Sequence, residues 1–177
     1  GLVGPGNNGG DTLVALTALV KEGWKAKAYL VKRKKDAFVK KFTEAGGEVL
    51  TGEKAFEQLA ESIGNSDLLL DGILGTGLKL PLKKELAELL AEVNDILDGL
   101  DEFPMVIAVD CPSGVDCDSG EAADETIAAD ITVTLAAVKQ GAKHIQIGYY
   151  LQGCLHQDVA ASRVMPQICR RYLDRFG

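Results

Sequence analysis

Short, continuous apolar runs alternate along the chain with segments in which apolar residues recur every three or four positions. The continuous runs predict buried strands, and the helical spacing predicts amphipathic helices. Leu2-Val3 is read as the end of a first strand. Further strands are predicted at 26–31, 48–50, 68–70, 105–109 and 131–135, and helices at 11–22, 38–45, 55–63 and from Pro81 to about Leu97.

Strands that are apolar along their whole length are typical of a parallel sheet covered on both faces. Their alternation with helices predicts a right-handed, doubly wound α/β fold of the Rossmann-like kind, with a mostly parallel sheet and helices on both faces. The length of 177 residues predicts one domain over residues 1–177. We interpret its start as truncated inside the first strand, and residues 142–177 as atypical because they lack the closing strand that such a fold would have.

The composition and the net charge argue against two classes of partner, membranes and nucleic acids. The chain is 46% hydrophobic and 25% charged, in the range of globular proteins. Its longest apolar stretches are far shorter than the roughly 20 residues that span a bilayer, so we expect no membrane partner. The net charge of −7 argues against nucleic acid as a partner.

The four cysteines form no C-x-x-C pair and there are only two histidines, so the chain offers little support for a zinc cluster. We therefore expect reduced thiols and a cytoplasmic location. Because the start of the chain is taken as missing, mitochondrial and secreted forms stay open. His144 and His156 are interpreted as packing or surface residues.

The residues suited to chemistry follow the predicted strands. After Leu2-Val3 comes Gly-Pro-Gly-Asn-Asn-Gly-Gly-Asp, residues 4–11, with the G-x-G-x-x-G spacing of a dinucleotide loop. Glycines there permit positive φ and let backbone N–H groups approach phosphate oxygens. The alternative is a purely structural turn, in which Asn7 is left-handed and Asp11 caps the helix. The basic run 32–35 stands where an NAD-dependent dehydrogenase has an acidic residue. We interpret it as a solvated face, and the alternative is tolerance of a 2′-phosphate.

Three more strand ends carry polar residues. Asp71 precedes Gly75-Thr76-Gly77, a loop able to hold anionic oxygens. Asp110 precedes Pro112-Ser113-Gly114, a tight turn that presents a hydroxyl. Thr132 and Thr134 follow Asp130 and are interpreted as ordinary strand residues.

Neighbouring strand ends would bring oxygen donors together from Asn8, Asp71 and Ser113. Hard cations take such donors, and one carboxylate with neutral partners suits a monovalent ion better than Ca²⁺. Spacing alone does not identify the ion.

Four motifs stand in order along residues 1–141: G-P-G-N-N-G-G-D, D-x-x-x-G-T-G, D-x-P-S-G and A-D-x-T-x-T. Together they resemble the NAD(P)H-hydrate epimerase family, also called the YjeF N-terminal domain family. The resemblance implies a Rossmann-like fold and an isomerase that interconverts the R and S forms of hydrated NADH or NADPH in nicotinamide nucleotide repair. The chain departs from the family pattern at Thr12, where glycine is usual.

The resemblance also implies a site. Hydrated dinucleotide would contact Asn7, Asn8, Gly9, Gly10, Asp11, Gly75, Thr76, Gly77, Leu78, Lys79, Leu80, Pro81 and Asp110. Potassium would bind Asn8, Asp71 and Ser113, and Asp110 is the candidate general acid and base. A homodimer is implied as well. The competing hypothesis is a non-catalytic nucleotide-binding or scaffold module of the same fold, for which all of these polar residues would not be needed.

Overall fold

Six parallel strands form one sheet in the computed structural model, which describes residues 1–134. Their order across the sheet is β3-β2-β1-β4-β5-β6. The strands are β1 (Leu2–Val3), β2 (Lys27–Leu30), β3 (Glu48–Leu50), β4 (Leu68–Gly72), β5 (Met105–Val109) and β6 (Ile131–Val133), and the helices are α1 (Asn7–Lys21), α2 (Ala37–Glu44), α3 (Ala55–Gly64) and α4 (Lys84–Asp98). The predicted Rossmann-like, doubly wound fold is confirmed. The expectations for His144, His156 and residues 142–177 lie outside the described residues.

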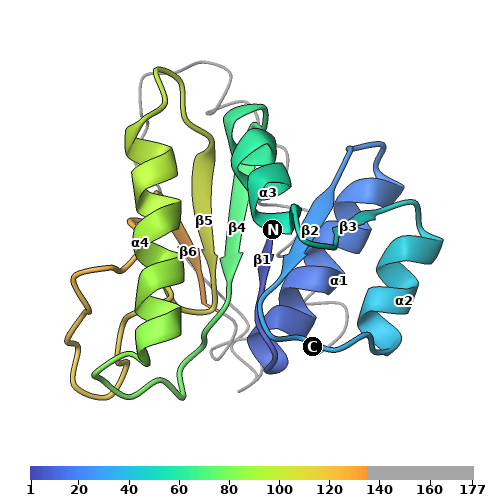
Figure 1. Cartoon of the computed structure of the whole chain (residues 1–177). Helices are drawn as coiled ribbons and strands as arrows, with labels where there is room; N and C mark the ends of the chain where they lie inside the picture. The colour runs from blue at the N-terminus through green and yellow to red at the C-terminus, as the bar shows by residue number, and fades with distance from the viewer. Residues whose placement is uncertain (135–177) are drawn as a thin grey trace.

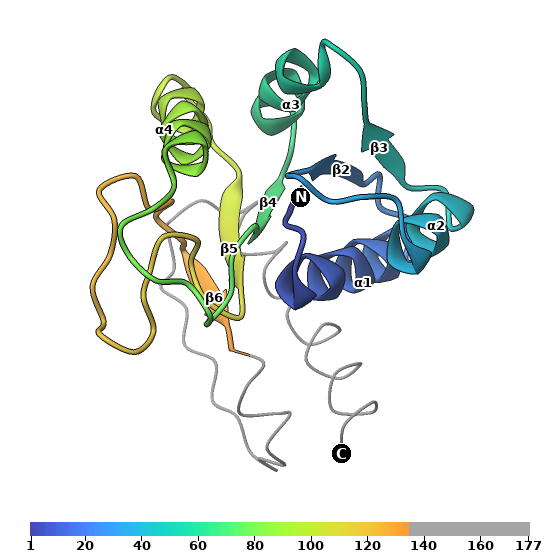
Figure 2. The same ribbon diagram turned by 60° about the horizontal axis from the view of Figure 1, so that its bottom comes forward.

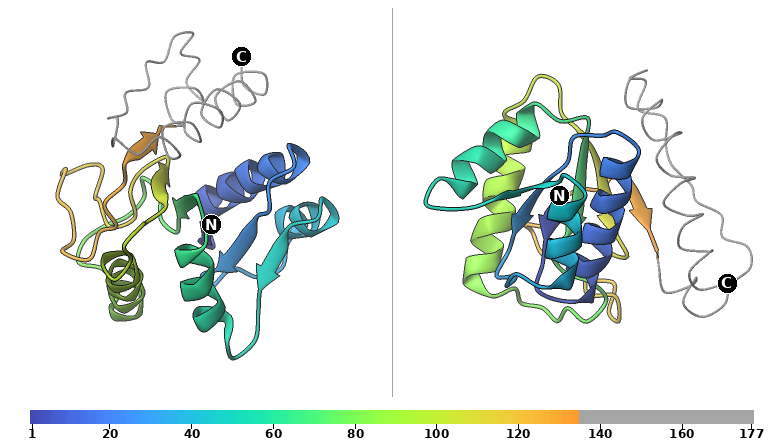
Figure 3. Two further views of the ribbon diagram at one scale, coloured as in Figure 1. Left: turned by 90° about the horizontal axis from the view of Figure 1, so that it is seen from above. Right: turned by 90° about the vertical axis from the view of Figure 1, so that its right-hand side faces the viewer.

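Helices cover both faces of the sheet in two pairs. α1 packs against α2 on one face and α3 against α4 on the other, as Figures 1 and 2 show from two sides. Viewed from above in Figure 3, the two pairs lie on opposite sides of the strands. Each face has its own core: Leu13 and Phe42 belong to the first, and Leu59, Leu90 and Val93 to the second. In the described part of the chain, no helix is long and apolar enough for a membrane crossing.

Two predicted helix starts were wrong. α1 begins at Asn7, four residues before the predicted start, with Gly6 extended as its N-cap (φ −87°, ψ −165°). The helical pattern of leucines could not reveal this first turn, because it consists of amides and glycines. α4 begins at Lys84 and not at Pro81, since Lys83 is still extended (φ −66°, ψ 138°) and the loop after β4 continues to that point.

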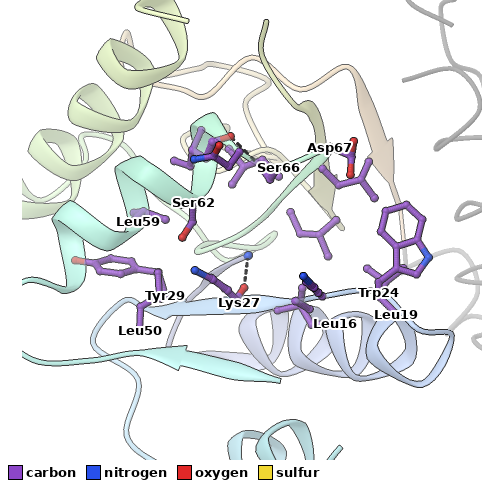
Figure 4. Close-up of a pocket in the computed structure, with 18 of the residues that line it drawn as sticks. Leu16, Leu19, Trp24, Lys27, Tyr29, Leu50, Leu59, Ser62, Ser66 and Asp67 are labelled. Atoms are coloured by element: carbon purple, nitrogen blue, oxygen red, sulfur yellow. Dashed lines mark hydrogen bonds between the residues drawn. The ribbon is translucent and has the colours of Figure 1, made fainter. Parts of the chain in front are cut away.

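The central strand β1 is only two residues long. It pairs with Tyr29 and Leu30 of β2 on one side and with Asp71 and Gly72 of β4 on the other. The amino-terminal halves of β2 and β4 therefore flank a cavity of about 620 Å³, shown in Figure 4. Core leucines form much of its wall, and the Gly1 amine donates a hydrogen bond to the Lys27 carbonyl there at 2.7 Å.

Candidate functional site

A larger cavity of about 1120 Å³ opens at the carboxyl ends of the strands, the end that faces forward in Figure 2. It lies where the chain order reverses between β1 and β4, the place where doubly wound sheets bind ligands. Most of the predicted substrate-binding residues line it: Asn7, Asn8, Asp11, Gly75, Thr76, Gly77, Leu78, Lys79, Pro81 and Asp110. Gly9, Gly10 and Leu80 are not among its lining residues.

Two of the glycines after β1, Gly4 and Gly9, serve close packing and not positive φ. A Cβ on Gly4 would lie 1.8 Å from the Ile73 carbonyl oxygen, and one on Gly9 would lie 2.0 Å from the Gly4 oxygen. Among the described residues, positive φ falls on other glycines. The expectation of left-handed glycines in this turn was wrong, and so was the alternative with a left-handed Asn7. The turn instead presses its backbone against the loop that follows β4.

Arg33 holds this glycine turn from behind. Its guanidinium donates to the carbonyl oxygens of Gly4 at 2.8 Å and Gly6 at 2.9 Å, and to the Asp36 carboxylate at 2.6 Å. The side chain is only 6% exposed, so the interpretation of residues 32–35 as a solvated face was wrong at this position. The usable sequence signal was Asp36: it caps α2 by accepting from the Phe38 and Val39 amides, and its carboxylate also fixes the arginine.

Asp71 and Ser113 meet at the carboxyl-terminal edge of the sheet, where β4 and β5 end. The Ser113 hydroxyl donates to Asp71 Oδ1 at 2.5 Å, and the Ser113 amide donates to Oδ2 at 2.7 Å. Both residues are completely buried. Burial raises the pKa of the Asp71 carboxyl, while the hydrogen bonds from Ser113 and Ile73 act in the opposite direction. Two strand ends separated by 42 residues are thus joined as the sequence predicted.

Asn8 comes from the first turn of α1 and is 7% exposed. Its Nδ2 donates to the Leu74 carbonyl, and Gly75 leaves room for it, since a Cβ there would stand 3.3 Å from the Asn8 Cβ. Within residues 1–134, the buried Asn8 Oδ1 has no hydrogen-bond partner. No group of three His, Cys, Asp or Glu side chains in that range could hold a metal ion. Any cation here would therefore depend on mixed amide, carboxylate and hydroxyl oxygens.

Asp110 occupies an unusual backbone conformation at the end of β5. Its φ is +69°, and the Cys111 amide donates to the Val109 carbonyl at 2.9 Å, so Asp110 is the centre of a three-residue γ-turn. The Asp110 amide donates to the Val133 carbonyl of β6 at 2.8 Å. Backbone strain of this kind concentrates at functional sites. The sequence did not predict this turn, although aspartate tolerates positive φ better than most residues.

Lys79 connects the loop after β4 with the loop after β5. Its ammonium lies 2.5 Å from Asp118 and 3.3 Å from Asp116. The hydrogen bond with Asp118, followed by that with Asp116, raises the pKa of Lys79. The loop that lines one wall of the cavity is thereby tied to the segment that follows Ser113.

Comparisons with known proteins agree with this geometry. The family model for the YjeF-related protein N-terminus matches residues 2–141. A second model, the methylaspartate mutase E chain, matches residues 125–177, less than half of the chain. The crystal structure of yeast ynu0 matches with a TM-score of 0.62 at 24% identity, covering 75% of this chain and 55% of that one, which supports the fold.

Curated relatives share the same region. The bifunctional NAD(P)H-hydrate repair enzyme Nnr of Thermofilum pendens is 38% identical over 120 residues, covering 63% of this chain and 22% of that protein. The NAD(P)H-hydrate epimerase of Clavibacter sepedonicus is 35% identical over 117 residues (64% and 51%), and that of Aedes aegypti is 31% identical over 152 residues (85% and 63%). The chain thus spans less than two thirds of each of these relatives.

Proposed function

The chain belongs to the family of YjeF-related protein N-terminal domains, and on that basis we propose that it epimerises hydrated NADH or NADPH. Relatives named NAD(P)H-hydrate epimerase support this activity. The observation that carries the proposal is the convergence of the glycine turn, residues 75–81 and Asp110 on one cavity of about 1120 Å³. A scaffold module would not need these three segments to meet around an open space.

The reaction requires the carbon that bears the hydroxyl group to lose and regain it. The ring nitrogen can push out the hydroxyl with its lone pair, leaving a cationic ring, and water then adds to the opposite face. In our proposal Asp110 donates a proton to the departing hydroxyl and takes one back from the incoming water. Such general acid and base catalysis typically contributes about 10²–10⁴-fold.

The turn before α1 would bind the phosphates of the dinucleotide. The amino end of a helix presents backbone N–H groups and a partial positive charge to an anion. Asn7 lies at that end, lines the cavity and is exposed. Arg33 adds a fixed positive charge behind the same turn.

We also propose that potassium binds between Asn8, Asp71 and Ser113. The support is the donor set itself: a buried amide oxygen without a partner among the described residues, and a buried carboxylate that Ser113 and Leu74 connect to Asn8 through hydrogen bonds. A bound monovalent cation would supply the positive charge that offsets the burial of Asp71. Homodimer formation and a cytoplasmic location stay predictions.

The decisive experiment mixes pure R-hydrate of NADPH with the protein in potassium buffer and follows the S form by chromatography or NMR. We expect equilibration well above the spontaneous rate, and a slower rate when sodium replaces potassium. A folded protein that binds the dinucleotide but leaves the R form unchanged would favour the binding-module hypothesis instead. Equal rates in both salts would remove potassium from the proposal while leaving the epimerase in place.

A further inference from the structure

Two cysteine thiols meet beside the candidate site. Cys111 Sγ and Cys117 Sγ lie 2.7 Å apart, and both thiols are free. A disulfide bond measures about 2.05 Å, so bonding requires the two sulfur atoms to approach by less than about 1 Å. The contact closes a loop across six positions of the chain.

The fold around the pair explains why the sulfurs meet. Residues 114–123 form a small hairpin, with Val115 bridged to Ala122 and the Asp116 amide donating to the Glu121 carbonyl at 2.9 Å. Cys117 stands near its tip, between the two aspartates that hold Lys79. Cys111 belongs to the γ-turn of Asp110. The hairpin therefore folds back over the turn and brings its thiol to Cys111.

The two thiols differ in access. Cys117 is exposed to solvent, whereas Cys111 is buried and only 5% exposed. A dissolved oxidant can therefore reach Cys117 first, and Cys111 is already in contact with the sulfur that would be attacked next. An accessible thiol in contact with a second thiol is an arrangement in which a mixed disulfide can be resolved into an internal one. Burial raises the pKa of the Cys111 thiol to about 12, so we expect this second step to be the slower one.

We propose that Cys111 and Cys117 are a thiol–disulfide modification site that takes a small disulfide such as oxidised glutathione. The Cys117 thiolate attacks the glutathione disulfide, forming a mixed disulfide and releasing one glutathione thiolate. Cys111 sulfur then bonds to Cys117 sulfur, the second glutathione leaves, and the proton of Cys111 goes to it. In sum, two protein thiols are oxidised to one disulfide, and one glutathione disulfide is reduced to two thiols.

The consequence is a reversible cross-link on the turn that carries Asp110 and Ser113. Because the sulfur atoms are in contact before oxidation, the bond fixes the turn where it already stands. A short closed loop also restricts the unfolded chain, which stabilises the folded state. We expect the oxidised protein to melt roughly 5–10 °C higher than the reduced protein, since each kcal/mol shifts Tm by about 2–4 °C at this size.

The test uses the full chain equilibrated in glutathione buffers of increasing oxidised fraction, quenched with acid, denatured, alkylated and then cleaved on the amino side of aspartate. Cleavage before Asp116 separates the two cysteines, so a disulfide is seen as two fragments that stay joined until reduced. We expect residues 110–115 and 116–117 to be joined in the oxidised samples. Cys117→Ser should abolish both this product and the rise in Tm, and a Cys154→Ser/Cys169→Ser variant should keep them.

Three results would overturn the proposal. Glutathione could remain on Cys117 while Cys111 is still alkylated, or the cross-link could join either cysteine to Cys154 or Cys169. The third is an oxidised protein that melts no higher than the reduced one, because then the bond would not fit this turn.

Discussion

The two cavities at opposite ends of the sheet differ in how their polar groups are satisfied. At the amino-terminal end, Ser62 in α3 and Ser66 just after it donate to carbonyl oxygens of α3 at 2.6 and 3.0 Å. At the carboxyl-terminal end, Asn8 Oδ1 is buried and, among the described residues, without a partner. Asp110, with its strained backbone, also lines this cavity. In the part of the chain that the structure describes, no non-glycine residue with positive φ lines the amino-terminal cavity. A cavity alone does not make a site; here an unsatisfied hydrogen-bond acceptor and a strained backbone mark the carboxyl-terminal cavity.

The largest effect is expected from Asp110→Asn at the carboxyl-terminal end. Asparagine also tolerates positive φ, so the turn should persist while proton transfer is lost. We expect the epimerisation rate to fall about 10²–10⁴-fold with little change in Tm. Asp98→Asn, at an exposed position at the end of α4, is the matched control and should leave the rate unchanged. A variant of Asp110 with the full rate would exclude it as the acid and base.

A substitution at the amino-terminal cavity should lower stability and leave the epimerisation rate nearly unchanged. Leu19 is 5% exposed and lines the amino-terminal cavity, so Leu19→Ala should cost roughly 3–4 kcal/mol in the free energy of unfolding. The epimerisation rate per folded molecule should stay within twofold of the original. Urea unfolding and a rate assay at low temperature measure both quantities. A fall in kcat without loss of stability would show that this cavity takes part in the reaction.

A pair of glycine variants sharpens the comparison within the carboxyl-terminal end. Gly4→Ala places a methyl group against the Ile73 oxygen and should cost roughly 2–3 kcal/mol in stability. Gly6→Ala meets no atom within 4 Å and should cost less than about 1 kcal/mol. Thermal unfolding of both proteins measures the difference. Equal stabilities would contradict the close contact between the turn and the loop after β4.

The smallest effect is expected from Arg33→Met. The variant keeps the apolar part of the side chain but removes the hydrogen bonds to Gly4 and Gly6, so we expect a loss of about 1.5 kcal/mol in stability. KM for the hydrated dinucleotide should rise roughly threefold, because the turn is less firmly held. Lys34→Met, at an exposed neighbouring position, is the control for charge alone. If both variants raise KM equally, charge and not positioning accounts for the effect.

Hydrophobic pattern was sufficient to predict most of the architecture. β5 and β3 were predicted at their observed bounds. β5 is apolar throughout, and β3 is a short segment bounded by the glycines at 46–47 and by Gly52. The joining of Asp71 to Ser113 also followed from the sequence, since carboxyl ends of parallel strands share one edge of the sheet. These predictions depend on repeated local signals.

The features that were missed depend on single tertiary contacts. Arg33 looks like its lysine neighbours in the sequence, and only the fold directs it to the Gly4 and Gly6 oxygens. Asp110 has positive φ, and its amide donates to the Val133 carbonyl of β6, a contact with a distant part of the chain. Periodicity carries no information about either contact.

During translation, the segments that line the carboxyl-terminal cavity are synthesised at very different times. The glycine turn is complete once Asp11 has been made, whereas Asp110 follows about a hundred residues later. Because β1 pairs with both β2 and β4, its second edge stays open during synthesis until β4 emerges. Open edges of apolar strands readily pair with foreign strands. We therefore expect nascent chains paused between β3 and β4 to be prone to non-native strand pairing.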